Sequence, residues 1–395
     1  MTTADTPHGR FNATMALIMG TLAMMGCFMA WSSFAPLAAQ IAKTFSLSVS
    51  QRTLLLATPV LLGSILRIPV GIFSDRYGGK KVYILLMLFV LIPLFLVPRV
   101  HSFGLLLIVA LLLGMSGTSF AVGISYVSVW FPPERQGLVL GIASLGNLGN
   151  AISALTLPRI AQHWDFTMVY NFLIGVLIIL IVIFAIFCKE MPVNKNKTFK
   201  DSLAVAKDAN TWYLSLFYAL TFGLFMSFSN LTPTMLGALF KMTPVDAGLW
   251  AAAFGAMCTI VRPIGGILSD KFRPMALLQW VLIGIGIFAL ELSGTLGAML
   301  PFELGLVMIG VIAGLGNGII FKMVPYVSKG NTGAVTGFVG AVGGLGGYFP
   351  PILLGVIQQA TGSYTIGLIL LAIFAALCWL VLWRNFIRGG SHIVQ

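Results

Sequence analysis

Residues 63–81 read GSILRIPVGIFSDRYGGKK, and the rest of the chain is organised around this stretch. Its centre is Arg67, which lies inside a long apolar run. A second copy, TIVRPIGGILSDKFR, occupies residues 259–273, so that Arg67 aligns with Arg262, 195 residues later. A charged side chain at the centre of a membrane helix costs roughly 2.5–3.5 kcal/mol on insertion scales. Two arginines at equivalent depth therefore indicate that an anionic partner binds between them.

The composition indicates that most of the surface faces lipid. The chain has 395 residues, of which 58% are hydrophobic and only 9% charged, whereas a soluble domain carries roughly 25% charged residues. The basic residues that give the net charge of +12 are spread over short loops, a pattern that argues against a nucleic-acid-binding surface. The four cysteines lie in or beside apolar segments without metal-ligand spacing, so we expect core residues and neither a metal nor a cofactor. The first apolar segment is too long for a cleaved signal peptide.

Apolar runs of about 20 residues are long enough to cross the hydrocarbon core of a bilayer as helices. The longest polar interruption, 189–210, separates six such runs from six others. We therefore predict an all-α integral membrane protein with two pseudo-symmetric six-helix halves, 1–188 and 211–395, joined by a cytoplasmic linker. The twelve predicted helices are 14–40, 51–73, 80–98, 103–129, 136–160, 166–188, 211–240, 246–268, 275–298, 302–327, 331–357 and 364–385.

The basic residues predict the orientation. Fifteen Lys and Arg residues fall in the termini and in the loops on their side, and five fall in the opposite loops. Because basic loops stay in the cytoplasm, this ratio places both termini and the linker inside a cytoplasmic membrane.

The two halves repeat each other beyond the opening stretch. Gly137–Gly141 of the fifth helix resembles Gly333–Gly337 of the eleventh, and Tyr126–Ser128 of the fourth helix resembles Tyr326–Ser328 of the tenth. A parallel repeat of two six-helix halves is typical of one large class of secondary transporters, which bind substrate near the membrane midplane.

None of the eleven acidic residues lies mid-helix beside Arg67 or Arg262, which favours an exogenous anion as their counter-ion. Glu291 and Glu303 are predicted near the outer ends of the ninth and tenth helices. Arginine in both copies favours a small oxyanion, because its planar fork donates parallel hydrogen bonds. The alternative is a structural role, in which the arginines snorkel or cap nearby carbonyls.

The inner ends of the second and eighth helices pair an acid with a base in each copy of the motif. Asp75 precedes Arg76, and Asp270 precedes Lys271. We predict a gate whose ion pairs form and break as the halves rock; the alternative is a solvated helix end. The glycines of the fifth and eleventh helices are expected to let helices pack closely. They are Gly141, Gly146, Gly149, Gly337, Gly343 and Gly346.

Four further side chains complete the predicted pocket. Tyr218 and Phe222 share one face of the seventh helix because they are four residues apart. Phe120 lies in the fourth helix, and Asn147 carries a buried amide in the glycine-rich fifth helix. Lys322 is a third cation inside a predicted helix.

These residues resemble the major facilitator superfamily over nearly the whole chain, and within it the nitrate/nitrite porters. The resemblance is carried by the segment from Phe120 to Gly137 and by the glycine-rich runs 141–149 and 337–347, which are similar to the paired nitrate signatures of that family. It implies that Arg67 and Arg262 clamp the anion, and that Tyr218, Phe222, Phe120 and Asn147 line its pocket. Lys322 departs from the pattern of pure exchangers and is a candidate for coupling to protons.

We therefore expect a monomeric transporter of nitrate, nitrite or both, working by alternating access as a nitrate/nitrite exchanger or a nitrate/proton symporter. The alternative is an exchanger of another small anion, such as a carboxylate or a phosphate ester. A sensor is disfavoured by the short linker, and an enzyme by the lack of acid, base or metal constellations in the sequence.

Overall fold

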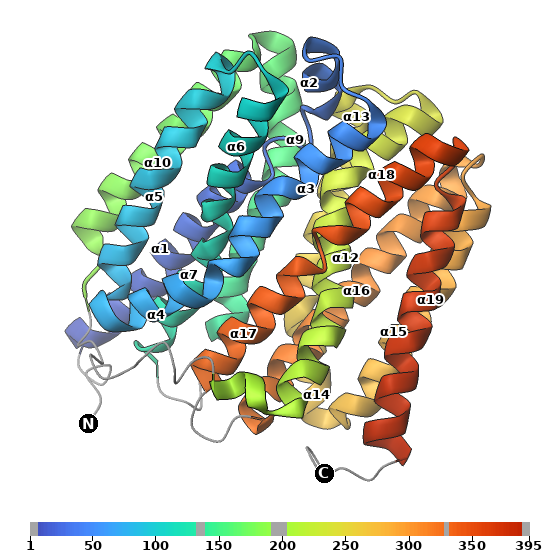
Figure 1. The fold of residues 1–395 in the computed structure, drawn as a ribbon. Coiled ribbons are helices and arrows are strands. Elements are labelled where there is room, and N and C mark those ends of the chain that lie inside the picture. Colours follow the sequence, from blue (N-terminus) through green and yellow to red (C-terminus); the bar gives the residue numbers. More distant parts are fainter. Residues whose placement is uncertain (1–6, 132–138, 191–203, 328–331, 389–395) are drawn as a thin grey trace.

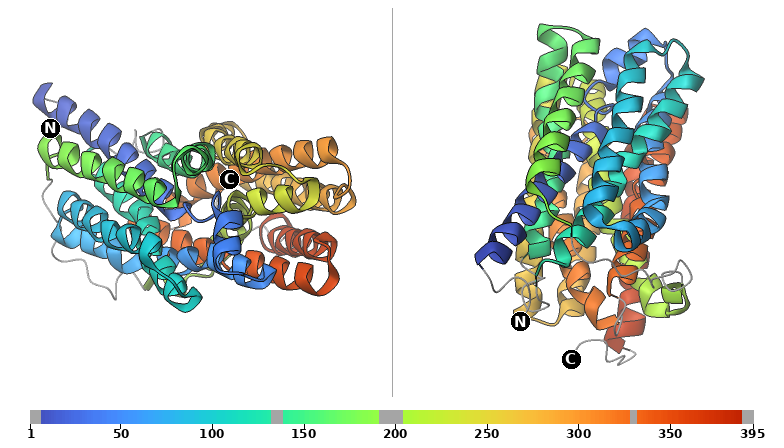
Figure 2. Two further views of the ribbon diagram at one scale, coloured as in Figure 1. Left: turned by 90° about the horizontal axis from the view of Figure 1, so that it is seen from above. Right: turned by 90° about the vertical axis from the view of Figure 1, so that its left-hand side faces the viewer.

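The computed structural model describes residues 7–131, 139–190, 204–327 and 332–388. Helices run along a common axis in two groups that lie side by side (Figures 1 and 2). In the described residues, eleven helices are long and apolar enough to span a membrane, or twelve if the bent pair α3 and α4 counts as one span. The predicted all-α, twelve-helix architecture is thereby confirmed.

The first group contains the helices up to α10. Their bounds are α1 (Pro7–Trp31), α2 (Ala38–Thr44), α3 (Val49–Ile65), α4 (Arg67–Tyr77), α5 (Gly79–Leu96), α6 (Phe103–Leu113), η3 (Gly114–Thr118), α7 (Ser119–Ser128), η4 (Ser144–Asn147), α9 (Leu148–His163) and α10 (Phe166–Phe187).

The second group begins after the linker, of which 191–203 lie outside the described residues. Its helices are α12 (Ala209–Phe240), α13 (Pro244–Ile260), α14 (Arg262–Lys271), α15 (Pro274–Gly294), α16 (Met299–Val327), α17 (Thr332–Leu345), α18 (Phe349–Thr361) and α19 (Thr365–Leu382). The described ends near both termini lie at the same end of the bundle (Figure 1), which we call the inner end.

Proline explains where the structure departs from the predicted helix bounds. The first helix ends at Trp31, not near residue 40, because Pro36 lacks an N–H and restrains the residue before it. The second helix bends by 41° between α3 and α4. Pro69 follows this break by three residues, and because proline has no N–H it cannot donate the helical hydrogen bond to the Ile65 carbonyl. The eleventh helix is likewise divided into α17 and α18, with proline in the first turn of α18.

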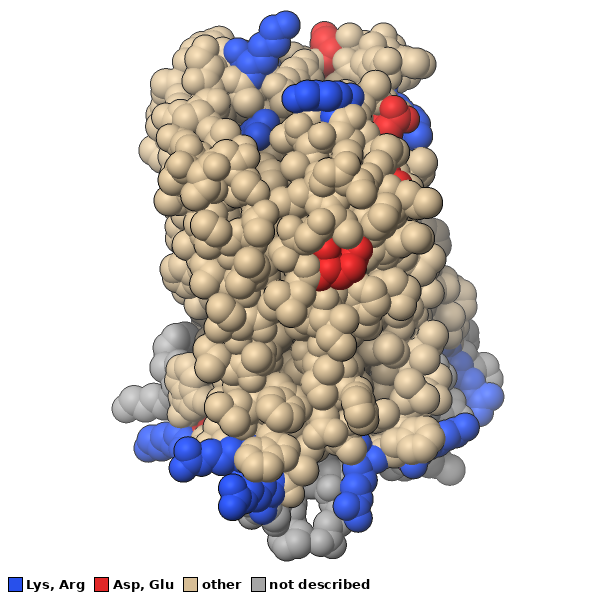
Figure 3. Space-filling view, turned by 90° about the vertical axis from the view of Figure 1, so that its right-hand side faces the viewer, with Lys and Arg blue, Asp and Glu red and all other residues tan. Residues whose placement is uncertain are grey.

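The two halves meet along several helix pairs. At the outer end α3 packs on α18 and α9 packs on α13, while α17 packs on α3 and α4 nearer the inner end. The backbone N–H of Ser50 donates to Gln359 Oε1 at 3.0 Å, which ties the start of α3 to α18. On the face shown in Figure 3, the surface between the ends is an almost uncharged belt that is interrupted by acidic side chains.

Candidate functional site

Arg67 and Arg262 occupy equivalent places in the two halves. Each is the first residue of an inner helix segment, α4 or α14, and each follows a break of a single residue, Leu66 or Val261. Both side chains are buried, with exposed fractions of 0% for Arg67 and 6% for Arg262. The repeat seen in the sequence is therefore a repeat in space, with both guanidinium groups inside the protein.

Arg67 extends from the first half to the second. Its Nη1 donates to the carbonyl of Gly340 in α17 at 2.7 Å, and its Nε donates to the carbonyl of Gly117 at 3.4 Å. Its Nη2 is buried and has no hydrogen-bond partner among the described residues. One end of a fully buried guanidinium is therefore available to a ligand.

The Phe222 ring lies beside both arginines. Its centroid is 5.1 Å from the guanidinium carbon of Arg67 and 5.4 Å from that of Arg262. Tyr218 stacks on Phe222 with ring centroids 4.9 Å apart and an interplanar angle of 12°. Arg262 Nη2 donates to the Tyr218 hydroxyl at 3.3 Å. One face of α12 therefore holds both arginines near each other, as the four-residue spacing of Tyr218 and Phe222 predicts.

The fifth predicted residue, Phe120 of α7, also belongs to this cluster. Its ring centroid lies 5.2 Å from the guanidinium carbon of Arg67. It contacts Phe321 of α16 edge-on at 6.0 Å, and Phe321 contacts Tyr218 at 4.9 Å. The aromatic rings thus form a chain of contacts from Phe120 to Phe222, and Arg67 lies against both ends of it. We call this group the arginine cluster: Arg67, Arg262, Tyr218, Phe222, Phe120 and Phe321.

Sequence reasoning missed several members of this environment. Trp31 and Phe225 lie within cation–π distance of Arg67 and Arg262, at 5.5 and 5.7 Å. Phe321 was also missed, although it directly precedes Lys322. Gly340 is a further missed residue, which contributes only its backbone carbonyl. The spacing of Phe225, three residues after Phe222, was a readable signal, whereas Trp31, Phe321 and Gly340 come from distant helices.

Asn147 is buried in η4, which packs against α1. Its Nδ2 donates to the Ser144 carbonyl at 2.6 Å, while its Oδ1 has no hydrogen-bond partner in the described parts of the chain. No hydrogen bond between Asn147 and the arginine cluster is found among the described residues. Its place in the pocket thus remains a prediction.

Neither arginine is paired with a carboxylate within the described ranges. Glu291 and Glu303 lie within the spans formed by α15 and α16, and Glu303 is only 3% exposed. Each has one buried oxygen without a hydrogen-bond partner in the described structure. Among the described residues, no carboxylate therefore pairs with the arginines, although two acids do lie inside the apolar belt.

Four of the six signature glycines let helices approach closely. A methyl group on Gly149 would lie 2.1 Å from the Met25 carbonyl of α1, and one on Gly346 would lie 2.0 Å from the Ala219 carbonyl of α12. Gly146 and Gly343 make equally close approaches to Met24 and Tyr218. The fifth helix thus packs on the first as the eleventh packs on the seventh.

The packing prediction does not hold for Gly141 and Gly337. Among the described residues, a methyl group on Gly141 would meet only Pro263 Cγ at 4.0 Å, and one on Gly337 would meet nothing within 4 Å. Both precede the tightly packed part of their helices, toward the inner end, where the neighbouring helices stand further off.

Each carboxylate of the predicted gate contacts a residue of its own half. The hydroxyl of Ser125 donates to Asp75, and Asp270 forms an ion pair with Lys322 of α16. Arg76 and Lys271 are exposed. Lys322, which the sequence presents as a third cation inside a helix, is therefore paired with a residue of the predicted gate, because the facing sides of α14 and α16 bring the two together. Its role in coupling stays a prediction.

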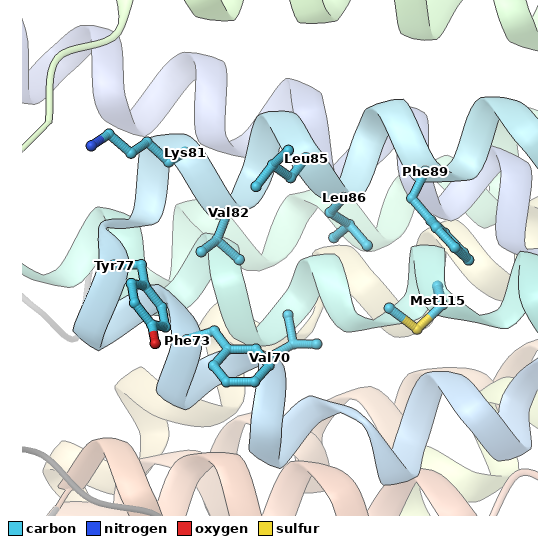
Figure 4. Close-up of a pocket in the computed structure, with 9 residues that line it drawn as sticks. All are labelled: Val70, Phe73, Tyr77, Lys81, Val82, Leu85, Leu86, Phe89 and Met115. Atoms are coloured by element: carbon cyan, nitrogen blue, oxygen red, sulfur yellow. The ribbon is translucent and has the colours of Figure 1, made fainter.

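A cavity of about 560 Å³ lies apart from the arginine cluster, between α4 and α5. Its lining is apolar except for the tips of Tyr77 and Lys81 at one end (Figure 4). Such a lining offers an anion no fixed donors in its interior, so this cavity is a poor candidate for the anion site.

Comparisons with known proteins agree with these observations. Residues 20–351 match the family model of the Major Facilitator Superfamily. The "Nitrite extrusion protein" of Bacillus subtilis is 36% identical over 387 residues, covering 95% of this chain and 96% of that protein. The "Probable nitrate transporter NarT" of Staphylococcus carnosus is 36% identical over 372 residues, covering 94% of this chain and 95% of that one.

Two solved structures share the fold. An inward-facing, occupied bacterial homolog of the human lysosomal transporter Spinster superposes with a TM-score of 0.77 at 17% identity, covering 95% of this chain and 98% of that one. The human organic anion transporter MFSD10 (TETRAN) gives 0.72 at 15% identity, covering 95% of this chain and 100% of that one.

Proposed function

This chain belongs to the major facilitator superfamily, and within it to the nitrate/nitrite porters, and from that membership we propose that it transports nitrate, nitrite or both by alternating access. The observation that carries this proposal is the buried Nη2 of Arg67, which has no partner in the described structure although the guanidinium is fully buried. A buried ionised donor without a partner is strongly unfavourable, so a bound anion would stabilise it.

The geometry of the arginine cluster suits a small, flat anion. A guanidinium donates parallel hydrogen bonds to two oxygens, and nitrate and nitrite both offer two oxygens in one plane. The rings of Trp31, Phe120 and Phe222 crowd the space around Arg67. We propose that the anion bridges Arg67 and Arg262 and that the rings exclude larger substrates.

The breaks before the two arginines add to this preference. Each arginine begins a helix, and the amino end of a helix carries a partial positive charge of roughly +0.5. Broken helices with their amino ends near an anionic substrate are a recurring design in secondary transporters. The segments α4 and α14 would therefore reinforce the charge of the side chains at their first residues.

The contact between Arg67 and Gly340 suggests how binding is linked to movement. It joins α4 of the first half to α17 of the second. An anion held by Arg67 and Arg262 would likewise join the halves, since the two arginines come from different halves. Without an anion, two like charges resist closure of the halves, so an empty carrier should reorient slowly.

Slow reorientation of the empty carrier favours nitrate/nitrite exchange. Proton symport remains the alternative, because Glu303 is a buried carboxylate within the membrane span and Lys322 is a cation close to Phe321 in sequence. The alternative to nitrate and nitrite as substrates is another small anion, such as a carboxylate.

Proteoliposomes separate these mechanisms. We would measure labelled nitrate uptake with and without internal nitrite, and with and without an inward proton gradient. Exchange predicts stimulation by internal nitrite alone, and symport predicts stimulation by the gradient alone. Uptake that is equal under all four conditions would refute both mechanisms. Inhibition by acetate or by a phosphate ester, but not by nitrite, would favour the other anion class.

We further propose that the protein lies in the cytoplasmic membrane as a monomer with both termini inside. This proposal is supported by the excess of basic residues at the inner end. Single cysteines placed in the outer loops and in the linker would test it through labelling of intact cells with an impermeant reagent. Labelling of the linker but not of the outer loops would show that the orientation is the opposite of the proposed one.

A further inference from the structure

A second group of polar side chains lies on the outer side of the arginine cluster. Beyond Phe222, α12 continues for eighteen residues toward the outer end, and this part carries buried hydroxyl and amide groups. Five of them, together with two from α9, each have an oxygen without a hydrogen-bond partner among the described residues. They are Ser227, Ser229, Asn230, Thr232 and Thr234 of α12, and Asn150 and Ser153 of α9.

Two asparagines connect the halves at this level by weak contacts. Asn150 Nδ2 of α9 lies 3.7 Å from the sulfur of Met226 in α12, and Asn230 Nδ2 of α12 lies 3.4 Å from the Leu56 carbonyl of α3. Hydrogen bonds of N–H to oxygen usually measure about 2.9–3.0 Å, and a thioether is a weak acceptor. Both amide groups therefore have N–H donors that a better acceptor would attract.

Both asparagines contact the part of α12 that lies outward of the arginine cluster or belong to it. Met226 and Asn230 are four residues apart and so share one face of α12. Asn230 follows Phe222 by eight residues, which places it about 12 Å further out along the helix. Asn150 of α9 therefore contacts α12 one turn before Asn230, and Asn230 contacts α3, at a junction of two helices of the first half with α12 of the second.

Small residues close this junction without supplying polar partners. A methyl group on Gly255 of α13 would lie 3.6 Å from the Ser229 hydroxyl and 3.7 Å from Ala151 Cβ of α9. One on Gly248 would lie 2.3 Å from the Ala154 carbonyl. A permanent interface between the halves would leave these polar groups unsatisfied, whereas an interface that opens lets them bond to water or to a passing ion.

We propose that Asn150, Asn230 and Ser229 form an outer anion subsite, which receives nitrate or nitrite when the outer ends separate and passes it to Arg67 and Arg262. The subsite rests on the proposed function. Its donors are neutral, so they bind an anion more weakly than the arginines do. An anion would consequently move inward to the stronger site, and it would leave the outer subsite quickly during export.

The test compares nitrate transport from the two faces. Proteoliposomes of defined orientation are made with the wild-type protein, Asn150→Leu and Asn230→Leu, which keep similar volume but lack the amide. We expect the half-saturating nitrate concentration at the outer face to rise about three- to tenfold, as for the loss of one neutral hydrogen bond. The value at the inner face should change by less than twofold, because only entry from outside passes the subsite first.

Asn317 provides the matched control. It is also a buried asparagine, its Nδ2 lies 3.8 Å from the Cys258 sulfur, and its Oδ1 lacks a partner among the described residues. Both residues belong to the second half, however, so the contact does not cross the interface. Asn317→Leu should leave the ratio of the outer to the inner half-saturating concentration unchanged.

Asn150→Asp keeps the size of the side chain and carries the test if a leucine variant does not fold. Its carboxylate should repel the anion and raise the outer half-saturating concentration more than leucine does. Equal changes at both faces, or unchanged values for all variants, would overturn the subsite while leaving the transport function intact. A wild-type protein that moves neither nitrate nor nitrite would overturn the proposed function itself, and the subsite with it.

Discussion

Replacing Arg67 with lysine tests the arginine cluster most directly, because it keeps the charge and removes the fork. In the structure Nη1 holds the Gly340 carbonyl while the buried Nη2 is left for the anion. A lysine gathers its three donors on one nitrogen. It cannot hold that carbonyl and also present a parallel pair of N–H groups to two oxygens.

The magnitude follows from the bond that is lost. A hydrogen bond to a charged group contributes about 1.5–3 kcal/mol. Since each 1.4 kcal/mol is a factor of ten, the dissociation constant of nitrate should rise about 10- to 150-fold in Arg67→Lys. Titration calorimetry of the purified protein with nitrate measures this change, and the melting temperature checks that the variant is folded.

Arg99→Lys is the control for general effects of the substitution. Arg99 is exposed, and its guanidinium lies 3.6 Å from the centroid of the Phe95 ring, so it also pairs with an aromatic side chain. Nitrate affinity should be unchanged in this variant. If Arg67→Lys is folded and binds nitrate within twofold of the wild type, the fork of Arg67 does not hold the anion.

Three further outcomes are expected. Phe222→Leu removes the ring shared by both arginines. Since each cation–π contact contributes about 0.5–2 kcal/mol, nitrate affinity measured by calorimetry should fall about fivefold or more. An unchanged affinity would mean that the ring only fills space. Gly346→Ala should lower the melting temperature, since overpacking costs about 1–3 kcal/mol, whereas Gly337→Ala should leave it within about 1 °C; equal melting temperatures would contradict the difference in packing. Burial raises the pKa of the Cys188 thiol to about 11, so it stays protonated at pH 7 and should react with maleimide only slowly, faster as the pH rises; rapid labelling of Cys188 at pH 7, located by mass spectrometry, would show that the inner end of α10 opens.

The sequence predicted those features that depend on local spacing or on charge in an apolar run. Arg67 and Arg262 stood out because a guanidinium is rare in a membrane span, and Tyr218 and Phe222 because four residues make one helical turn. The repeat of two six-helix halves also predicted a transporter and not an enzyme, and the named relatives support this prediction.

What the sequence did not predict depends on how distant helices face each other. Phe321 joins the cluster because α16 turns it toward α12, and Lys322, the next residue, consequently points to Asp270 on α14. Gly141 and Gly337 carry the same pattern as Gly149 and Gly346, yet only the latter pair has a neighbour close by. The breaks at Leu66 and Val261 were missed for a different reason, because the predicted helices 51–73 and 246–268 ran through Pro69 and Pro263, whose missing N–H groups interrupt the helix.

The hydrogen bond from Arg67 to Gly340 ends on a backbone carbonyl, and every amino acid has one. A methyl group at position 340 would lie 3.9 Å from Arg67 Nη1, an ordinary contact, so alanine fits there as well. The acceptor therefore survives substitution at its own position, and a genetic screen for loss of this link would recover changes at Arg67 or in the path of α17. Alanine at residue 340 would therefore leave the bond between the halves in place.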